Sequence, residues 1–245
     1  MLVLARVLHK LREETASLFP ARFFSVSGLS MTLVFGVVVL RGWLQPLPSG
    51  LWLDEMGTYY MVSGSWNDFL ERMARAIQSP LYCTFLWAWV KLAGLSEVAL
   101  RLPSVLALGV TGFLVYRLAA RMVDKSAGLL AVLAFFSAPP VMKLGLQARQ
   151  YTWGMLAATL TMTLLLNWLI ARTWKCAILC GLSVTLLLYI HPLNFTLAMA
   201  AVGIVAFCHL YRHSIPLGQI LLFVAVVAVC AAPVVPYYWG AAKES

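Results

Sequence analysis

The sequence predicts an all-α, polytopic membrane protein with about seven transmembrane helices. Of its 245 residues, 62% are hydrophobic and only 11% are charged, and the mean hydropathy is +0.87. A soluble domain usually carries about 25% charged residues. Apolar runs close to the ~20 residues that cross a bilayer recur along the whole length. We therefore treat residues 1–245 as one transmembrane module without a separate soluble domain.

The predicted spans follow one another through short polar links. The first apolar run comes after a charged stretch, Arg6 to Arg22, and no small-residue cleavage pattern follows it. It is therefore interpreted as a retained span and not as a signal peptide. The predicted spans are Phe23–Leu40, Val98–Ala119, Ala127–Leu144, Tyr151–Ile170, Cys176–Ile190, Pro192–Leu210 and Ile215–Tyr237.

The segment Ser79–Gly94 is apolar but short, and whether it crosses decides the side of every later loop. If it does not cross, most basic residues of the later links share the cytoplasmic side, as the positive-inside rule requires. These residues are Arg117, Arg121, Lys125, Arg172, Lys175 and Arg212, against Lys143, Arg149 and Lys243 on the other side. We expect Ser79–Gly94 to be an interfacial helix on the outer face, where Trp87 and Trp89 suit the headgroup level.

This topology brings the unusual polar residues to one side of the membrane. The long loop of residues 41–97 is then extracytoplasmic, together with the turn at Leu144–Tyr151 and the turn at His191. No internal repeat is evident, so the sequence does not favour an inverted-repeat transporter.

Charge and cysteine content exclude two other classes. The net charge of +9 comes from residues in short loops, where orientation signals lie, and forms no continuous stripe for nucleic acid. Cys176 and Cys180 are four residues apart, but inside an apolar run, so packing is favoured over a metal site.

The adjacent carboxylates Asp54 and Glu55 are the leading catalytic candidates. Only nine Asp and Glu residues occur in the chain, and these two lie side by side just outside the first span. A carboxylate at a low-dielectric boundary has a tunable pKa and can act as a general base. The alternative is that they are solvated charges in the first turn of a helix, where acids are favoured.

Arg149 and His191 are candidates for binding an anion at the same outer face. A guanidinium grips phosphate through a planar fork of donors, whereas Lys143 is better explained by snorkelling at a helix end. His191 precedes Pro192, which suits a helix start, so His191 could bind a phosphate, ligate a metal or cap a helix. A lone histidine is weak evidence for a metal.

Two further residues, Arg101 and Tyr82, could have either a local structural role or a role in the site. Arg101 could pair with Glu97, four residues earlier on the same helix face, or face the site. Tyr82 offers a hydroxyl to a polar headgroup. Ser79 and Pro80 are explained by capping and starting the helix that contains Tyr82.

Together these segments resemble the GT-C class of membrane glycosyltransferases. The branch that they resemble includes dolichyl-phosphate-mannose protein mannosyltransferases and the lipid A aminoarabinose transferase. The resemblance covers about Trp52 to Phe195. It rests on Asp54-Glu55, Gln78-Ser79-Pro80-Leu81-Tyr82, Gly94-Leu95-Ser96-Glu97-Val98-Ala99-Leu100-Arg101-Leu102-Pro103-Ser104, Gln147-Ala148-Arg149-Gln150-Tyr151 and Tyr189-Ile190-His191.

The resemblance implies a polyprenyl-phosphate-linked sugar as donor and transfer on the extracytoplasmic face. It implies that Asp54 is the catalytic base, with Glu55 beside it as the second catalytic candidate, and that Arg149 and His191 lie near the donor phosphate or a divalent metal. We assign Arg101, Tyr151 and Tyr82 to the same phosphate site. Members of the class usually continue past a seven-span core, so a fragment, a minimal enzyme or half of a split enzyme with a second polypeptide remain open.

The sequence therefore favours an inverting glycosyltransferase of the bacterial inner membrane that acts in cell envelope glycosylation. Its partners would be a lipid-linked sugar donor and membrane lipids, with no nucleic acid and no certain cofactor. A flippase for a lipid-linked sugar is the first alternative, but it would place ionisable residues near mid-membrane, where the spans carry almost none. A non-catalytic partner subunit is the second.

Overall fold

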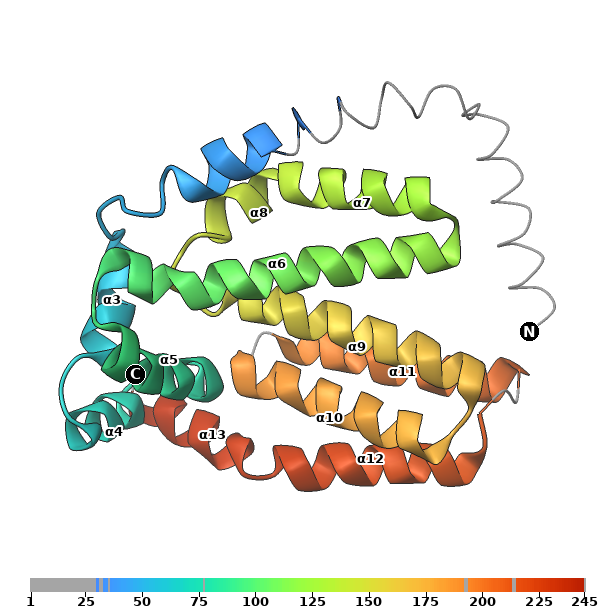
Figure 1. Cartoon of the computed structure of the whole chain (residues 1–245). Coiled ribbons are helices and arrows are strands. Elements are labelled where there is room, and N and C mark those ends of the chain that lie inside the picture. The colour runs from blue at the N-terminus through green and yellow to red at the C-terminus, as the bar shows by residue number, and fades with distance from the viewer. Residues whose placement is uncertain are drawn as a thin grey trace.

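The computed structural model describes residues 30, 33–34, 36–76, 78–191, 194–212 and 215–244, and this part of the chain is helical without strands. A π-helical turn, Leu40–Leu44, precedes the first labelled helix (Figure 1). The helices are α3 Leu53–Val62, α4 Trp66–Ala74, α5 Pro80–Ala93, α6 Glu97–Met122, α7 Lys125–Ser137, α8 Pro139–Leu144, α9 Tyr151–Ala171, α10 Trp174–Ile190, α11 Phe195–Arg212, α12 Leu217–Ala231 and α13 Val234–Glu244.

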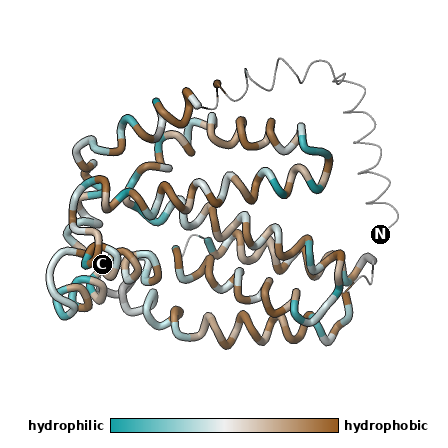
Figure 2. Tube along the Cα trace, viewed as in Figure 1, coloured by the Kyte–Doolittle hydropathy of each residue, from teal (hydrophilic) through white to brown (hydrophobic). Residues whose placement is uncertain are grey.

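The long helices lie side by side and form an apolar bundle (Figure 1). Helix α6 packs against α7 and α9, and α10 packs against α9, α11 and α12. Hydrophobic residues cover most of their length (Figure 2). Two helices of the described part, α6 and α9, are long and apolar enough to cross a bilayer, and α12 with α13 would add a third if this bent pair is one span. The chain is an integral membrane protein.

The short helices α3, α4 and α5 gather at one end of this bundle (Figure 1). Helix α5 packs against α3, α6 and α10. The predicted start of this helix is confirmed, because Ser79 Oγ accepts a hydrogen bond of 3.1 Å from the Tyr82 N–H and Pro80 occupies the first turn. The helix ends at Gly94, whose φ of +83° is a conformation that L side chains rarely adopt.

Two predicted spans are interrupted. The expected span Ala127–Leu144 is divided into α7 and α8 at Ala138, because Pro139 lacks an N–H and pushes the preceding residue out of the helical region. The expected last span bends by 44° between α12 and α13. Pro233 lies in the short link between these two helices. The predicted first span lies largely outside the described residues, as does the predicted helix start at Pro192.

Helix α13 fastens the group of short helices to the bundle. The Tyr237 hydroxyl lies 3.3–3.4 Å from the carbonyl oxygens of Met73, in the last turn of α4, and of Ala76 and Gln78, which follow this helix. The neighbouring Tyr238 hydroxyl donates to the Leu188 carbonyl at 2.9 Å, on α10. These two tyrosines therefore hold the α4–α5 link against the end of α10.

Candidate functional site

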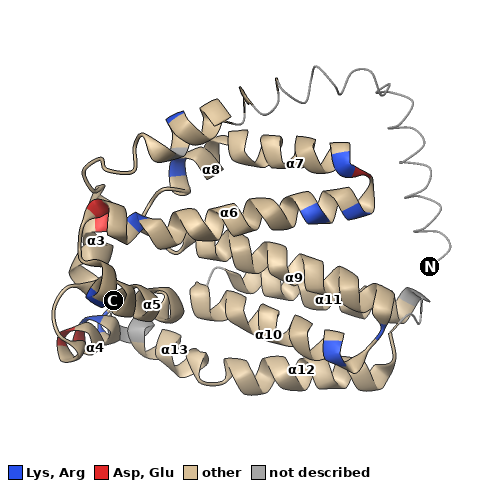
Figure 3. Cartoon of the chain, in the orientation of Figure 1, with Lys and Arg blue, Asp and Glu red and all other residues tan. Residues whose placement is uncertain are grey.

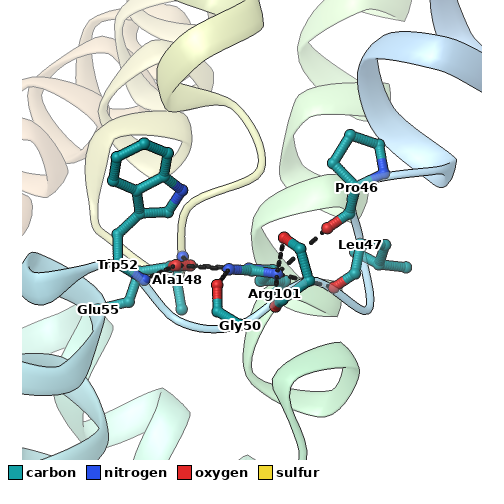
Figure 4. Close-up of polar contacts among 8 residues, drawn as sticks. Pro46, Leu47, Gly50, Trp52, Glu55, Arg101 and Ala148 are labelled. Atoms are coloured by element: carbon teal, nitrogen blue, oxygen red, sulfur yellow. Dashed lines mark hydrogen bonds and ion pairs between the residues drawn. The ribbon is translucent and has the colours of Figure 1, made fainter.

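The end of the bundle that holds α3, α4 and α5 is centred on a buried ion pair between Glu55 and Arg101 (Figure 4). Arg101 Nε donates to Glu55 Oε1 at 2.8 Å, and Nη2 donates to Oε2 at 2.6 Å. Both side chains are almost fully buried, Arg101 being 2% exposed and Glu55 0%. The alternative that Arg101 pairs with Glu97 is corrected, since the Arg101 side chain turns into the protein toward α3.

The rest of the Arg101 guanidinium binds the loop that leads into α3 (Figure 4). Nη1 donates to the carbonyls of Leu47 at 2.8 Å and Ser49 at 2.7 Å, and Nη2 donates to Gly50 at 3.1 Å. These carbonyl oxygens accept no hydrogen bond within a helix or sheet, so the guanidinium of Arg101 supplies the hydrogen bonds that the backbone of this loop needs. Arg101 therefore shapes the loop and does not face the exterior.

Glu55 connects three separate parts of the chain. Besides Arg101, its carboxylate accepts hydrogen bonds from the backbone N–H groups of Trp52, at 2.9 Å, and Ala148, at 2.7 Å. Burial alone would raise the pKa of Glu55, but the hydrogen bonds from Arg101, Trp52 and Ala148 and the Arg101 charge lower it below 4.5. Glu55 is therefore an ionised carboxylate with all of its strong acceptor positions in use.

Asp54 and Arg149 meet on the exposed side of this arrangement. Asp54 is exposed in the first turn of α3, and Arg149 Nη1 donates to its backbone carbonyl at 3.1 Å, across 95 residues of sequence. Arg149 is half-buried, lies 5.8 Å above the Tyr151 ring centroid, and has an Nε with no hydrogen-bond partner among the described residues. The Glu55–Ala148 bond fixes the turn that carries Arg149.

His191 and Tyr151 border a cavity of about 380 Å³ between α9 and the start of α11. Gln150 and Asn194 complete its polar rim, and its remaining lining residues are Leu144, Gly154, Met155, Ala158 and Leu197. Burial, together with the positive charge of Arg149, holds the pKa of His191 below its usual 6.5. His191 is thus a neutral imidazole near neutral pH.

Tyr82, which we assigned to the phosphate site, is buried. Its side chain is 0% exposed and its ring lies 5.7 Å from the Trp153 ring in an edge contact. The backbone amides of Trp52 and Ala148 and the side chain of Asn194 could not be recognised as site groups from sequence, because every residue has a backbone amide and an isolated asparagine forms no motif.

No group of three or more His, Cys, Asp and Glu side chains suited to a metal ion occurs within the described ranges. If His191 ligates a metal ion, ligands of other chemical kinds must therefore complete the coordination. All five cysteines are free thiols, and Cys180 is packed in the core between α9, α10, α11 and α12.

The fold and the site define a helical integral membrane protein with a buried ion pair and an exposed carboxylate at one end of its bundle. A family model described as dolichyl-phosphate-mannose-protein mannosyltransferase matches residues 78–239, and the chain belongs to this family. The matched range includes Arg101, Arg149 and His191, whereas Asp54 and Glu55 precede it. Searches of curated proteins and of solved structures found no match.

Proposed function

We propose that the protein transfers a sugar from a polyprenyl-phosphate donor to an acceptor hydroxyl. The observation that carries this proposal is the hydrogen bond from the Arg149 guanidinium to the backbone carbonyl of Asp54, which places a side chain suited to phosphate beside the residue that bears an exposed carboxylate. Membership in a glycosyltransferase family supports the reaction class.

In the proposed reaction Asp54 is the general base. Its carboxylate takes the proton of the acceptor hydroxyl while the acceptor oxygen attacks the anomeric carbon of the donor. The bond between that carbon and the phosphate oxygen breaks, and the lipid phosphate leaves with the electron pair. A single displacement of this kind inverts the anomeric configuration.

Arg149 stabilises the leaving phosphate. Its Nε is available for a ligand oxygen, and its Nη1 is already held at Asp54, so a phosphate bound by this guanidinium lies beside the proposed base. Preorganised charge at a leaving group is commonly the largest contribution to catalysis. His191, neutral near pH 7, adds a hydrogen bond or a ligand for a divalent metal.

Glu55 and Arg101 position these groups and take no part in proton transfer. Their four mutual and backbone contacts tie the start of α3 to the turn before Arg149. A change at either residue would move Asp54 relative to Arg149.

The donor lipid fits the cavity between α9 and α11. The polar rim at Tyr151 and His191 suits the phosphate, and the apolar wall at Met155, Ala158 and Leu197 suits the first prenyl units. A prenyl chain is already dissolved in the bilayer, so it can enter between helices.

We place the site on the extracytoplasmic face of a bacterial inner membrane, with about seven spans and α5 at the outer interface. The basic residues at the opposite ends of α6, α7 and α10 support this orientation (Figure 3). The described spans carry their charges near their ends, which favours an enzyme over a flippase. A second polypeptide is compatible with this arrangement.

Replacing Asp54 with Asn tests the proposed base. Asp54→Asn should reduce sugar transfer from a prenyl-phosphate-linked donor by about 10²–10⁴-fold, with an unchanged unfolding temperature, because the side chain is exposed. Glu71→Gln is the matched control, since Glu71 is a second exposed carboxylate at the same end, paired only with Arg75. Near-parental transfer by Asp54→Asn would remove this residue from the reaction.

A further inference from the structure

We propose that a second cavity, lined in part by the Glu55–Arg101 pair, binds the phosphate headgroup of a membrane lipid. This site goes beyond the proposed transfer reaction, because it lies apart from Arg149 and His191. It is formed between the loop before α3, helix α8 and the turn that follows α8, and its volume is about 230 Å³.

The size of the cavity limits its ligand to a small group. Pockets for drug-sized molecules begin at about 300 Å³, so this cavity holds a headgroup and not a whole lipid. Its lining includes Trp52, Lys143 and Gln147, with Glu55 and Arg101 at its inner wall.

The charge of the lining requires an anion. Glu55 and Arg101 neutralise each other through two short hydrogen bonds. Lys143 is exposed, lines the cavity, and forms no ion pair with an acidic residue in the described part of the chain. The lining therefore carries one uncompensated positive charge, and an ammonium group is a common ligand of phosphate.

Gln147 supplies a polar group without a partner beside this charge. Its Oε1 is buried and has no hydrogen bond to any described residue. Leaving a buried amide oxygen without a partner is unfavourable, and a change of rotamer that turns the carboxamide into the cavity presents its NH₂ donors to a ligand. An oxygen-rich ligand would then be bound by both Gln147 and Lys143.

The surroundings of the cavity indicate that the phosphate belongs to a lipid. Besides Lys143 and Ser49, the exposed residues at its edge are large and apolar or aromatic, with Trp52 67% exposed and Met142 40% exposed, and Leu53 beside them is 85% exposed. Such a surface is poorly solvated, and Trp is enriched where protein meets lipid headgroups. A membrane lipid can place its phosphate in the cavity while its acyl chains cover these residues.

Thermal unfolding of the purified full chain in a neutral detergent tests the proposal. The probes are dioctanoyl phosphatidic acid, dioctanoylglycerol and inorganic phosphate. Phosphatidic acid should raise the unfolding temperature more than the neutral glycerolipid does. Lys143→Gln should require about tenfold more lipid for the same rise in unfolding temperature, because it removes a charged hydrogen-bond donor to the phosphate. Arg75→Gln, which removes an exposed positive charge at the same end, should respond as the parent does.

Three outcomes would overturn the proposal or part of it. If Lys143→Gln responds as the parent does, the cavity is not the binding site. If Arg149→Gln loses the response and Lys143→Gln keeps it, the lipid occupies the donor site, which leaves the proposed transfer reaction intact. If inorganic phosphate protects as well as phosphatidic acid through Lys143, the anion site stands and the lipid source is wrong. Lys143→Arg should retain the response and so controls for misfolding.

Discussion

At the residue scale, the structure around the start of α3 depends on Arg101, which binds both a carboxylate and backbone carbonyls. Arg101 binds the Glu55 carboxylate with two nitrogens and the loop carbonyls with the same planar group. Removing one member of a buried ion pair typically costs ~3–5 kcal/mol, whereas the pair itself is weak evidence for net stability. The value of this pair therefore lies in fixing where α3 begins.

Glu55→Gln should make the protein less stable near neutral pH and less sensitive to acid. The folded-state pKa of Glu55 is lowered below 4.5, so its stabilising contribution is present above pH 4.5 and is lost as the pH falls through the folded-state pKa. Unfolding temperatures measured from pH 7 to pH 3 should fall further for the parent than for Glu55→Gln. Parallel curves for the two proteins would contradict the proposed role of the ion pair.

Arg149→Lys should weaken donor binding although it keeps the charge. A guanidinium can hold Asp54 and two phosphate oxygens together, while an ammonium acts as a point charge. Binding of farnesyl phosphate to the purified chain should weaken about tenfold. Arg75→Lys is the control at an exposed position of the same end. Equal binding by the parent and Arg149→Lys would assign Arg149 to the membrane interface alone.

Only part of the candidate site could be predicted from individual residues. Asp54, Glu55 and Arg149 stand out because charges are scarce in this chain. Their different surroundings could not be predicted, since Glu55 is buried by contacts 46 and 93 residues away in the sequence. Adjacent carboxylates point to different sides of a helix, and only the fold decides which side is covered.

At the element scale, the close contact of α6 and α7 depends on a glycine. A Cβ at Gly112 would lie 2.5 Å from the Phe136 ring, closer than real Cβ contacts allow. Gly109, one turn earlier on α6, has no atom within 4 Å of such a Cβ. The two positions thus separate the effect of packing from that of helix propensity.

Gly112→Ala should lower the stability of the protein, and Gly109→Ala should preserve or raise it. Overpacking a closed contact typically costs ~1–3 kcal/mol, whereas alanine gains up to ~1 kcal/mol over glycine in a helix. Thermal unfolding of both variants in the same detergent measures the difference. A Gly112→Ala protein as stable as Gly109→Ala would mean that α7 moves away from α6 without cost.

Local signals predicted some elements well and failed at their interruptions. Helix α5 was predicted from Ser79, Pro80 and Gly94, which act within their own turns. The break at Ala138 was missed because the apolar run continues through Pro139 and Pro140, so hydropathy treats α7 and α8 as one segment. The bend before α13 was missed for the same reason.

At the scale of the whole molecule, the charged residues divide between the two ends of the bundle (Figure 3). Basic residues lie at one end, with Arg121 in the last turn of α6, Lys125 at the start of α7, Arg172 after α9 and Lys175 in the first turn of α10. Helices α3 and α4 lie at the opposite end (Figure 1). If α5 remains at the outer interface, the two ends face opposite sides of the membrane.

Cysteine labelling in intact cells tests this orientation. In a protein whose five native cysteines are replaced, Asn67→Cys on α4 should react with an impermeant thiol reagent and Ala171→Cys at the end of α9 should not. Both positions are exposed, so accessibility in the folded protein is matched. After the membrane is permeabilised, both should react. Labelling of Ala171→Cys in intact cells would reverse the proposed sidedness.

The carboxylate of Glu55 also sets an order of assembly during synthesis. Its partner Arg101 leaves the ribosome 46 residues later and the Ala148 amide 93 residues later. Until both arrive, an ionised group destined for the interior must stay in water, since burying it alone is costly. The start of α3 can therefore close only after α6 and the turn before α9 have been synthesised, so the proposed site cannot mature before the nascent chain extends past Ala148.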